Sequence, residues 1–339
     1  MIKIIEHKGE WDKWVSSMDH FDFYHTYDYH QLLCNIDEKV LLIAYEQGTT
    51  QIGLPVIERT LENGYKDLTS VHGYLGPVHK NLDHDFENKD FSKALKNLLE
   101  SKKIIAIFSK LNPYVPMQNA ILKNMGRIEN VGELVYFDQT SNEEEQRTAY
   151  SRNTRQVLKK LRKNSYIRVG DLKKDLKAFI KYYHRSLDRL KAKSLFYFDE
   201  NYFTTLFNSN FFTTDILFAV NCETNEIMAG ALLIETKEIA HVELAFTVEK
   251  YFKSSPLRLL FDECRKRYKK NDVKFLNLGG GTGGREGSLM RFKSSFSKNY
   301  AAFKVWKFVV MPKAYENMLT EEQKNTESNF FPKYRLKTA

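Results

Sequence analysis

The fold of this chain is decided by residues 273–297, VKFLNLGGGTGGREGSLMRFKSSFS. The apolar run Val273–Leu278 predicts a buried strand, and residues 279–284 follow it with five glycines and one threonine. Glycine weakens a structure unless the backbone needs a positive φ or a very close approach. We therefore expect a ligand or another backbone to come close at this loop. A helical rhythm in Ser288–Lys293 then places Lys293 just beyond it, where an anion or a developing negative charge is a plausible target.

The same loop fits two other readings. Gly279, Gly281 and Gly284 match the G-x-G-x-x-G pattern of dinucleotide-binding Rossmann folds. That fold needs a βαβ unit with an acidic residue about 20 positions on. The next predicted strand, residues 303–311, ends in Val309-Val310-Met311 without an acid. A Rossmann-type enzyme is thus a disfavoured alternative, and a tight connection with no ligand stays open.

Composition favours a two-domain protein that works on an anionic partner. The 339 residues contain 42% hydrophobic and 28% charged residues, and the formal net charge is +9. No apolar run approaches the roughly 20 residues of a membrane span, and the N-terminus lacks an apolar signal core. The three cysteines lie far apart without metal-ligand spacing. We expect a cytoplasmic protein with no metal site and no DNA partner, one that binds a phosphate-bearing molecule, RNA or, peripherally, a membrane surface.

A polar tract at residues 140–146, TSNEEEQ, is the best domain boundary. It predicts an N-terminal domain over 1–143, a C-terminal catalytic domain over 147–311, and a tail over 312–339 that packs back on the body. The helix predicted over 147–163 is strongly basic, and Arg152 and Arg155 share a face with Lys159 and Arg162. Like charges stacked on one face repel unless an anion relieves them, so the face is either a phosphate grip or simply solvated.

Two further constellations point to chemistry. The predicted strand 239–248 places His241 and Glu243 on one face with Ile239 and Ala245, and one of the two is a candidate general base unless they lie at a rim open to water. Downstream, Ser255 and Pro256 predict the N-cap and first residue of a helix over 257–268. A helix start there, with Ser254 beside it, predicts an anion site.

Several short segments resemble the FemA/FemB-like branch of the GNAT acyltransferase superfamily. In the second half they are YSRNTRQVLKKLRK, LDRLKAKSLFYFDENYF, AHVELAF, KSSPLRLLFDE, LNLGGGTGGREGSLMRFKSSFS and FFPKYR. In the first half they are FYHTYDYHQLL, VHGYLGPV and FSKLNP. The resemblance implies an α/β (α+β) chain with two tandem GNAT-like domains, each a mixed, mostly antiparallel sheet flanked by helices.

The resemblance also implies a function. Fem enzymes move an aminoacyl group from a charged tRNA to an amine on a peptidoglycan precursor. An arginine of their basic helix grips the nucleotide-sugar diphosphate, and Arg155 matches it; a Phe-Lys pair after the glycine loop matches Phe292-Lys293. The chain departs from the family at Tyr29 and Gln31, where Fem enzymes often carry tryptophan and lysine. No stretch shows the heptads of the coiled-coil arm of staphylococcal Fem proteins. Relatives of this shorter type often modify surface polysaccharides.

The expected activity is therefore acyl or aminoacyl transfer from acyl-CoA or aminoacyl-tRNA, with no permanently bound cofactor. The acceptor is an amine on a nucleotide-sugar or lipid-linked glycan. Glu243, with His241 beside it, accepts the amine's proton. Lys293 and amides of Gly280, Gly281 and Gly283 steady the oxyanion or the leaving group. Ser254 and Ser255 hold one phosphate, and Arg152 and Arg155 hold the other anionic partner. A non-catalytic RNA-binding module is the main rival, because the net charge and the basic helix fit it as well.

Overall fold

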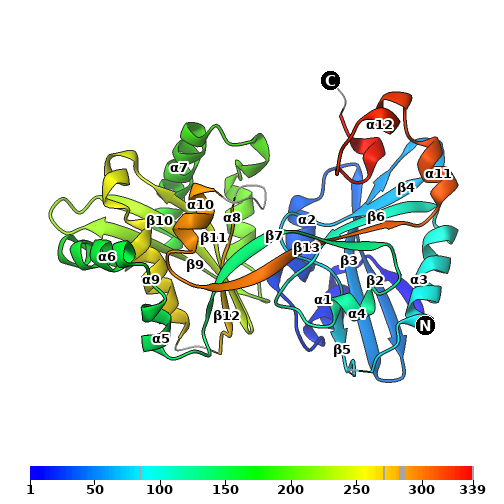
Figure 1. Ribbon diagram of the computed structural model, residues 1–339, viewed down its shortest axis with the longest axis horizontal. Coiled ribbons are helices and arrows are strands. Elements are labelled where there is room, and N and C mark those ends of the chain that lie inside the picture. The colour runs from blue at the N-terminus through cyan, green and yellow to red at the C-terminus, as the bar shows by residue number, and fades with distance from the viewer. Residues whose placement is uncertain (84, 270–271, 282–286, 338–339) are drawn as a thin grey trace. The chain divides into compact units, whose positions relative to one another are not determined.

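The computed structural model of the chain describes residues 1–83, 85–269, 272–281 and 287–337. By packing, the chain divides into two compact units (Figure 1). Unit 1 comprises Met1–Val131 and Ala302–Ala339, and unit 2 comprises Gly132–Ala301. The chain leaves unit 1 within strand β7 (Arg127–Asp138) and returns to it within β13 (Asn299–Val309). The domain limits predicted from the sequence, 1–143, 147–311 and 312–339, stay predictions.

Unit 1 contains a sheet in the order β1-β2-β3-β4-β6-β13, with β5 paired to β3. Its ladders are antiparallel, except that β4 runs parallel to β6. A hairpin joins β2 and β3, which pair from Gln47↔Thr50 to Glu38↔Arg59. The remaining strands of this unit are β1 (Ile2–Ile5), β2 (Glu38–Gln47), β3 (Thr50–Thr60), β4 (Lys66–Thr69), β5 (Val78–Lys80) and β6 (Ile104–Lys110).

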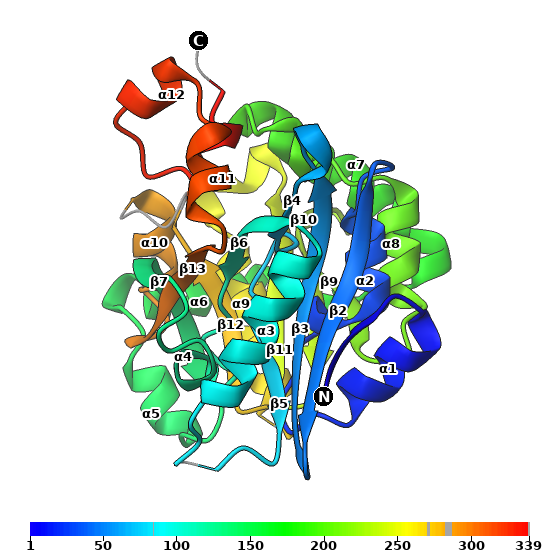
Figure 2. The same cartoon turned by 90° about the vertical axis from the view of Figure 1, so that its right-hand side faces the viewer.

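Helices cover both faces of this sheet. On one face α3 (Lys89–Ser101) buries Phe91, Leu95 and Leu99 in a cluster with alternate residues of β3, and Figure 2 shows it lying along the strands. On the other face a Cβ at Gly53 would come within 3.1 Å of the Trp14 indole of α1, so that helix lies close on the strand. The other helical segments are α1 (Lys8–Ser16), η1 (Phe23–His25), α2 (Tyr27–Leu33), η2 (Glu62–Gly64) and α4 (Gln118–Ile121).

The residues after Met311 form short helical segments that pack on unit 1. They are α11 (Pro312–Asn317), α12 (Glu321–Asn325) and η6 (Lys333–Arg335). Ala314 and Tyr315 join a cluster with Ile105 and Ala106 of β6. We call residues 312–337 the C-terminal segment.

Unit 2 contains a sheet in the order β7-β12-β11-β10-β9-β8. Only β11 and β12 pair in parallel; the other described ladders of this unit are antiparallel. The strands are β8 (Ser165–Val169), β9 (Thr213–Asn221), β10 (Ile227–Thr236), β11 (Ile239–Thr247) and β12 (Phe275–Gly280). Strand β12 is the strand predicted over 273–278, and β8 was not predicted.

Capping residues fix where the helices of unit 2 begin. The side chains of Ser151, Asp171 and Asp199 accept hydrogen bonds from backbone amides in the first turns of α6, α7 and α8. The polar tract 140–146 lies within this unit, where its end enters α5 through a capping box of Asn142 and Glu145. The helical segments are α5 (Glu143–Thr148), α6 (Arg152–Asn164), α7 (Leu172–Leu190), η3 (Ser194–Phe196), α8 (Glu200–Phe207), η4 (Glu249–Ser254), α9 (Leu257–Tyr268) and α10 (Ser288–Lys293).

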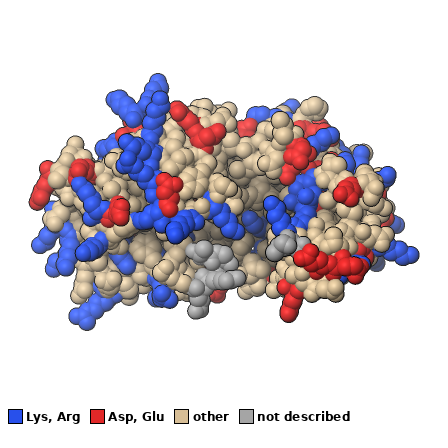
Figure 3. Space-filling model, turned by 90° about the horizontal axis from the view of Figure 1, so that it is seen from above, with Lys and Arg blue, Asp and Glu red and all other residues tan. Residues whose placement is uncertain are grey.

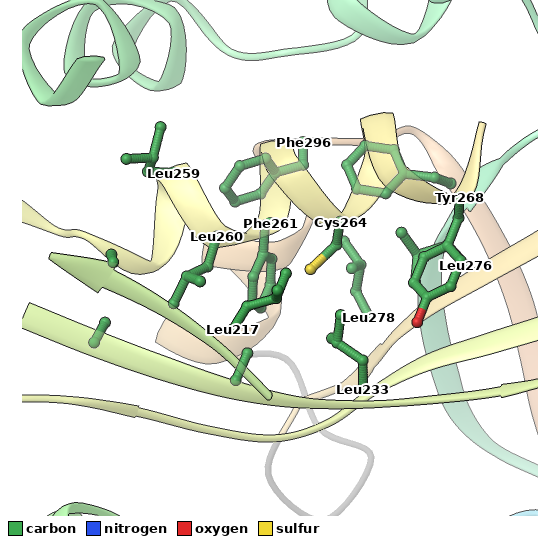
Figure 4. Packing of buried hydrophobic residues seen from close by; sticks show 14 of the residues in the cluster. Leu217, Leu233, Leu259, Leu260, Phe261, Cys264, Tyr268, Leu276, Leu278 and Phe296 are labelled. Carbon is green, nitrogen blue, oxygen red and sulfur yellow. The ribbon is translucent and has the colours of Figure 1, made fainter. Parts of the chain in front are cut away.

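Helices cover both faces of the sheet of unit 2. On one face α9 buries Leu260, Phe261 and Cys264 against strand residues, as Figure 4 shows. On the other face Phe179 of α7 packs edge-on against Phe246 of β11, with ring centroids 5.2 Å apart. The predicted fold class, mostly antiparallel mixed sheets flanked by helices in tandem, is confirmed. The Rossmann alternative is wrong, because it needs a doubly wound parallel sheet.

Candidate functional site

Strands β11 and β12 pair over only part of their length. The parallel ladder joins Ile239↔Phe275, Ala240↔Leu276 and His241↔Asn277. Beyond it β11 continues to Thr247 and β12 to Gly280, but among the described residues the two strands form no further ladder pairs with each other. The strands part at the level of His241, so the residues that follow on each strand border the same site.

A β-bulge in β11 lies at this point. In the ladder with β10, Leu232 pairs with Leu244 and Leu233 with Val242, so Glu243 is the extra residue. Ala240, Val242 and Ala245 pack in the cluster under α9. The alternation therefore places His241 and Glu243 together on the opposite face, as predicted, but Ala245 is not on that face. The prediction for Ala245 is wrong because the bulge reverses the alternation after Glu243.

His241 is buried and holds the start of the glycine turn. Its Nδ1 lies 3.1 Å from Nδ2 of Asn277, whose Oδ1 accepts a hydrogen bond of 2.8 Å from the amide of Gly279. Since Oδ1 of Asn277 is the acceptor, its Nδ2 is a donor, and Nδ1 of His241 accepts from it. That nitrogen is thus occupied in positioning Asn277 and the turn.

Gly280 stands at the end of β12, where only glycine fits. A Cβ there would lie 2.7 Å from the carbonyl oxygen of Glu133 in β7. The close approach that the glycines predict is therefore, at this position, an approach to the neighbouring strand. Gly281 follows as a partly exposed bend, and Gly283 lies outside the described residues.

Lys293, the last residue of α10, reaches back to this turn. Its Nζ donates a hydrogen bond of 2.9 Å to the carbonyl oxygen of Gly280. Burial lowers the pKa of Lys293 to about 8, although the charge of Glu243 acts in the opposite direction. An ammonium has three N–H donors, and the contacts of the described residues use one of them.

Glu243 is the carboxylate that acts on Lys293, and it also faces α7. Burial raises the pKa of Tyr183, and the nearby charge of Glu243 raises it further. The hydroxyl of Tyr183 donates to the carbonyl of Phe196, 3.2 Å away, at the end of η3. Lys293, Glu243 and His241 therefore gather around the point where β11 and β12 part.

The predicted N-cap at Ser255 is wrong. Ser255 has a left-handed backbone (φ 54°) and follows η4, while Pro256 occupies the cap position of α9 without a side-chain hydrogen bond. Ser254 Oγ donates to the carbonyl of Tyr251, 2.7 Å away. The predicted span of α9, Leu257–Tyr268, is confirmed. The chain turns sharply into the helix, and Ser255 contributes its backbone to that turn.

The basic helix is not a uniform cationic face. It begins at Arg152 rather than at residue 147. Arg155 is exposed, but its Nη1 donates to the carbonyls of Tyr150 (2.8 Å) and Thr148 (3.4 Å), at the end of α5. Arg162 forms an ion pair with Asp262 of α9. Two of the four predicted cations, Arg155 and Arg162, thus form contacts within the protein. Arg152 and Lys159 are exposed.

Sequence reasoning missed Arg258, which lies beside α10. It is 8% exposed, and its Nη1 donates to Thr154 Oγ1 and to Ser295 Oγ. Its guanidinium lies 5.0 Å from the ring centroid of Phe292, the residue before Lys293. No described carboxylate forms an ion pair with it. The sequence did contain a signal for it, because this arginine interrupts the apolar run at the start of the helix predicted over 257–268.

Other features of the described residues bear on partners. Lys and Arg cover more of the face in Figure 3 than Asp and Glu do, in keeping with the net charge of +9. No described helix combines the length and apolarity needed to cross a membrane. Within the same residues, no three His, Cys, Asp or Glu side chains are grouped to hold a metal ion.

Comparison with known proteins gives likenesses of structure only. No protein-family model matches the chain, and no curated protein matches it by sequence. The crystal structure of FemX superposes with a TM-score of 0.70 at 11% identity, covering 93% of this chain and 99% of that one.

Two further structures cover 91% of the chain. A Bacteroides thetaiotaomicron protein of unknown function matches with a TM-score of 0.59 at 11% identity over 100% of its own length. A C-terminal domain from Agrobacterium fabrum, assigned to a lysylphosphatidylglycerol synthetase, matches with a TM-score of 0.56 at 13% identity over 95% of its length. As the FemA/FemB resemblance predicted, the chain has the fold of FemX over nearly its whole length.

Proposed function

We propose that this protein is an acyltransferase that moves an acyl or aminoacyl group from an activated donor to an amine. The observation that carries the proposal is the half-buried Lys293, whose ammonium bonds the Gly280 carbonyl and faces the charge of Glu243. A buried lysine with a lowered pKa beside a carboxylate, where two strands part, is typical of a functional site. The likeness of the fold to that of FemX supports the proposal.

The proposed chemistry needs an acid-base pair and an oxyanion site. When an amine attacks a thioester or ester carbonyl, a tetrahedral oxyanion forms and the attacking nitrogen must lose a proton. Glu243 accepts that proton, directly or through one water. The ammonium of Lys293 uses a free N–H to stabilise the oxyanion, or the leaving group as the C–S or C–O bond breaks. The amides of Gly280 and Gly281 border the same point.

His241 has a narrower role in this proposal. Its Nδ1 accepts from Asn277, so it positions the turn that carries Gly280. We assign proton transfer to Glu243 alone and treat His241 as a positioning residue. This refines the paired role that the sequence suggested.

The donor and acceptor are proposed by class. The sharp turn at Ser254 and Ser255 leads into the amino end of α9, where the positive end of the helix dipole favours a phosphate of acyl-CoA or of an aminoacyl-tRNA. Exposed Arg152 and Arg155 are placed for long-range attraction of a diphosphate on a nucleotide-sugar or lipid-linked glycan acceptor. A cell-envelope role follows from this acceptor class and from the likeness to FemX.

Incubation with candidate donors tests the proposal. Purified protein is mixed separately with acetyl-CoA and with charged tRNA, with and without an amino-sugar nucleotide, and products are followed by mass spectrometry. We expect acyl transfer or donor hydrolysis with one donor, and loss of it when Lys293 is replaced by methionine. Salt-sensitive binding to generic RNA with neither donor consumed would instead support the RNA-binding alternative.

A further inference from the structure

A cavity of about 900 Å³ lies in unit 1, and none of the site residues assigned above lines it. The C-terminal segment and strands of the unit 1 sheet line it together. Its walls include Arg59, Phe108, Val131, Lys307, Phe330 and Arg335. Its size is within the range of small-molecule sites, which is roughly 300–1,000 Å³.

Two arginines of this cavity share one buried carboxylate. Asp67 has no exposed surface, and its two oxygens accept from Nε of Arg59 (2.7 Å) and from Nε and Nη2 of Arg335 (2.6 and 3.2 Å). The hydroxyl of Tyr334 donates to the same carboxylate at 3.0 Å. These contacts fill the four acceptor positions of the carboxylate.

The two arginines have N–H donors that the described contacts do not use. Each guanidinium carries five N–H groups, and the described contacts use one of those on Arg59 and two of those on Arg335. Nη2 of Arg59 is buried without a hydrogen-bond partner. The charges are unequal as well, because two guanidiniums face one carboxylate while Lys307 is matched by Glu129 at 2.5 Å. An added anion would correct both imbalances.

The rest of the wall is apolar and aromatic. Phe108 and Phe331 lie with ring centroids 6.5 Å apart. Val131 and Phe330 are 40% and 50% exposed, so their apolar surface is open to a ligand in the cavity. A ligand with a flat apolar body and an anionic head would cover these side chains and reach the guanidiniums.

The cavity is already formed in the chain by itself. The backbone amide of Lys333 donates to the Tyr315 hydroxyl at 2.8 Å, and Gln323 Nε2 donates to the carbonyls of Tyr334 and Leu336, each at 3.0 Å. These bonds hold the C-terminal segment in place. A ligand therefore meets an ordered wall and loses little affinity to its rearrangement.

We propose that this cavity binds a small aromatic anion, a carboxylate or phosphate carried on a planar ring. Arg335 and Arg59 bind the head, and Phe330 with Phe108 binds the ring. The proposal concerns unit 1 and does not depend on acyl transfer in unit 2.

Titration calorimetry on the full chain tests the proposal with phenyl phosphate, benzoate and inorganic phosphate as probes. We expect at least one aromatic anion to bind about tenfold or more tightly than inorganic phosphate, because the ring adds apolar contact. Comparison of the two aromatic probes decides whether the head is a phosphate or a carboxylate. If neither exceeds inorganic phosphate, the proposal is overturned.

Three variants locate the binding. Arg335→Gln is expected to weaken the better probe about tenfold, because charge-assisted hydrogen bonds are lost. Phe330→Ala should weaken the aromatic probe but leave inorganic phosphate unchanged; it removes an exposed side chain, so folding is retained even if Arg335→Gln proves unstable. Arg127→Gln, at a strongly exposed arginine of the same unit outside the cavity wall, is the matched control. Equal weakening by Arg335→Gln and Arg127→Gln, or no effect of Phe330→Ala, would refute the site.

Discussion

Lys293 is held in the folded protein at the expense of stability. Its ordinary pKa is 10.5, and burial brings it to about 8, with Glu243 acting against that decrease. Between these two pH values the unfolded chain binds more protons than the folded one, so stability rises with pH across that window. Below pH 8 the charged group is present in both states, and its burial disfavours folding by up to about 3 kcal/mol. A residue kept under such a penalty is a strong candidate for a functional role.

Replacing this lysine should separate activity from stability. We expect Lys293→Met to lower kcat about a hundredfold or more, because an oxyanion donor is lost. The free energy of unfolding at pH 7 should stay equal or increase, because a buried charge is removed. Lys298→Met is the matched control, since Lys298 is exposed on the same stretch and bonds only the Ser294 carbonyl. Unchanged turnover in Lys293→Met, measured beside urea denaturation, would remove the lysine from the site.

The pH dependence of turnover distinguishes the two possible roles of Lys293. If its ammonium stabilises the oxyanion, kcat falls about tenfold per pH unit above a pH of about 8, where the proton is lost. If the neutral amine were instead the general base, kcat would rise up to a pH of about 8 and then level off. Turnover measured from pH 6 to 10 at saturating donor decides between them.

At the scale of single residues, the sequence predicted the surroundings of some side chains better than those of others. Lys293 and Glu243 lie near the same glycine turn because a strand, a glycine turn and a short helix leave few ways to fold back, and their catalytic roles stay predictions. Ser255 was misassigned because a serine before a proline is typical of an N-cap, whereas the chain turns there through a left-handed residue. The role of Arg155 could not be foreseen, since its partners are backbone carbonyls that only the fold brings close.

Helix α9 carries two buried arginines, Arg265 and Arg258, which differ in whether carboxylates lie beside them. Arg265 has no exposed surface and bonds the Tyr150 hydroxyl (3.0 Å), Gln146 Oε1 (2.9 Å) and Glu143 (3.2 Å), with Asp262 3.5 Å away. Burial by itself raises the pKa of Asp262, but hydrogen bonds from Tyr150 and Arg162 outweigh it and leave the pKa low. Among the described residues Arg258 has hydroxyl groups and aromatic rings as partners, and burial lowers its pKa.

Methionine at each position should therefore act in opposite ways. Arg265→Met removes the partner of a buried network and should lower the unfolding free energy by about 3 kcal/mol. Arg258→Met removes an unpaired buried charge and should leave stability nearly unchanged. It should instead lower kcat more than it changes KM, because Ser295 and Phe292 then no longer fix the end of α10. The rate of amine labelling at Lys293, read by mass spectrometry, should change in Arg258→Met. No change in that rate would limit Arg258 to a packing role.

The elements show which parts of the fold a sequence encodes locally. The bounds of α9 were predicted at both ends because its proline start and its apolar periodicity mark them. The bulge at Glu243 leaves no such mark, since it depends on the register of β11 against β10. The point where the ladder between β11 and β12 ends could not be predicted either, because it also depends on how two strands pair.

At the scale of the whole molecule, the units differ in how the chain builds them. Unit 2 is one continuous segment, whereas unit 1 needs residues from both ends of the sequence. Strand β13 supplies Val305–Val309 as the partner of β6, and the C-terminal segment covers Ile105 and Asp67. The polar tract that the sequence offers as a domain boundary, residues 140–146, lies inside unit 2.

Fragments test that difference. The fragment 132–301 is expected to unfold cooperatively on heating, as judged by circular dichroism. The fragment 1–131 should show no cooperative transition, because β6 lacks a neighbour and Asp67 keeps only one of its two guanidinium partners. Cooperative unfolding of 1–131 alone would show that residues 302–339 add little to its core.

The split construction of unit 1 also sets an order of events on the ribosome. The first 131 residues emerge early, yet their sheet waits for a strand made about 170 residues later. The nascent chain must therefore carry the open edge of β6 and its apolar neighbours while unit 2 is synthesised. Exposed strand edges of this kind promote aggregation. This topology therefore predicts that the N-terminal half depends on chaperones during synthesis, although that half is translated first.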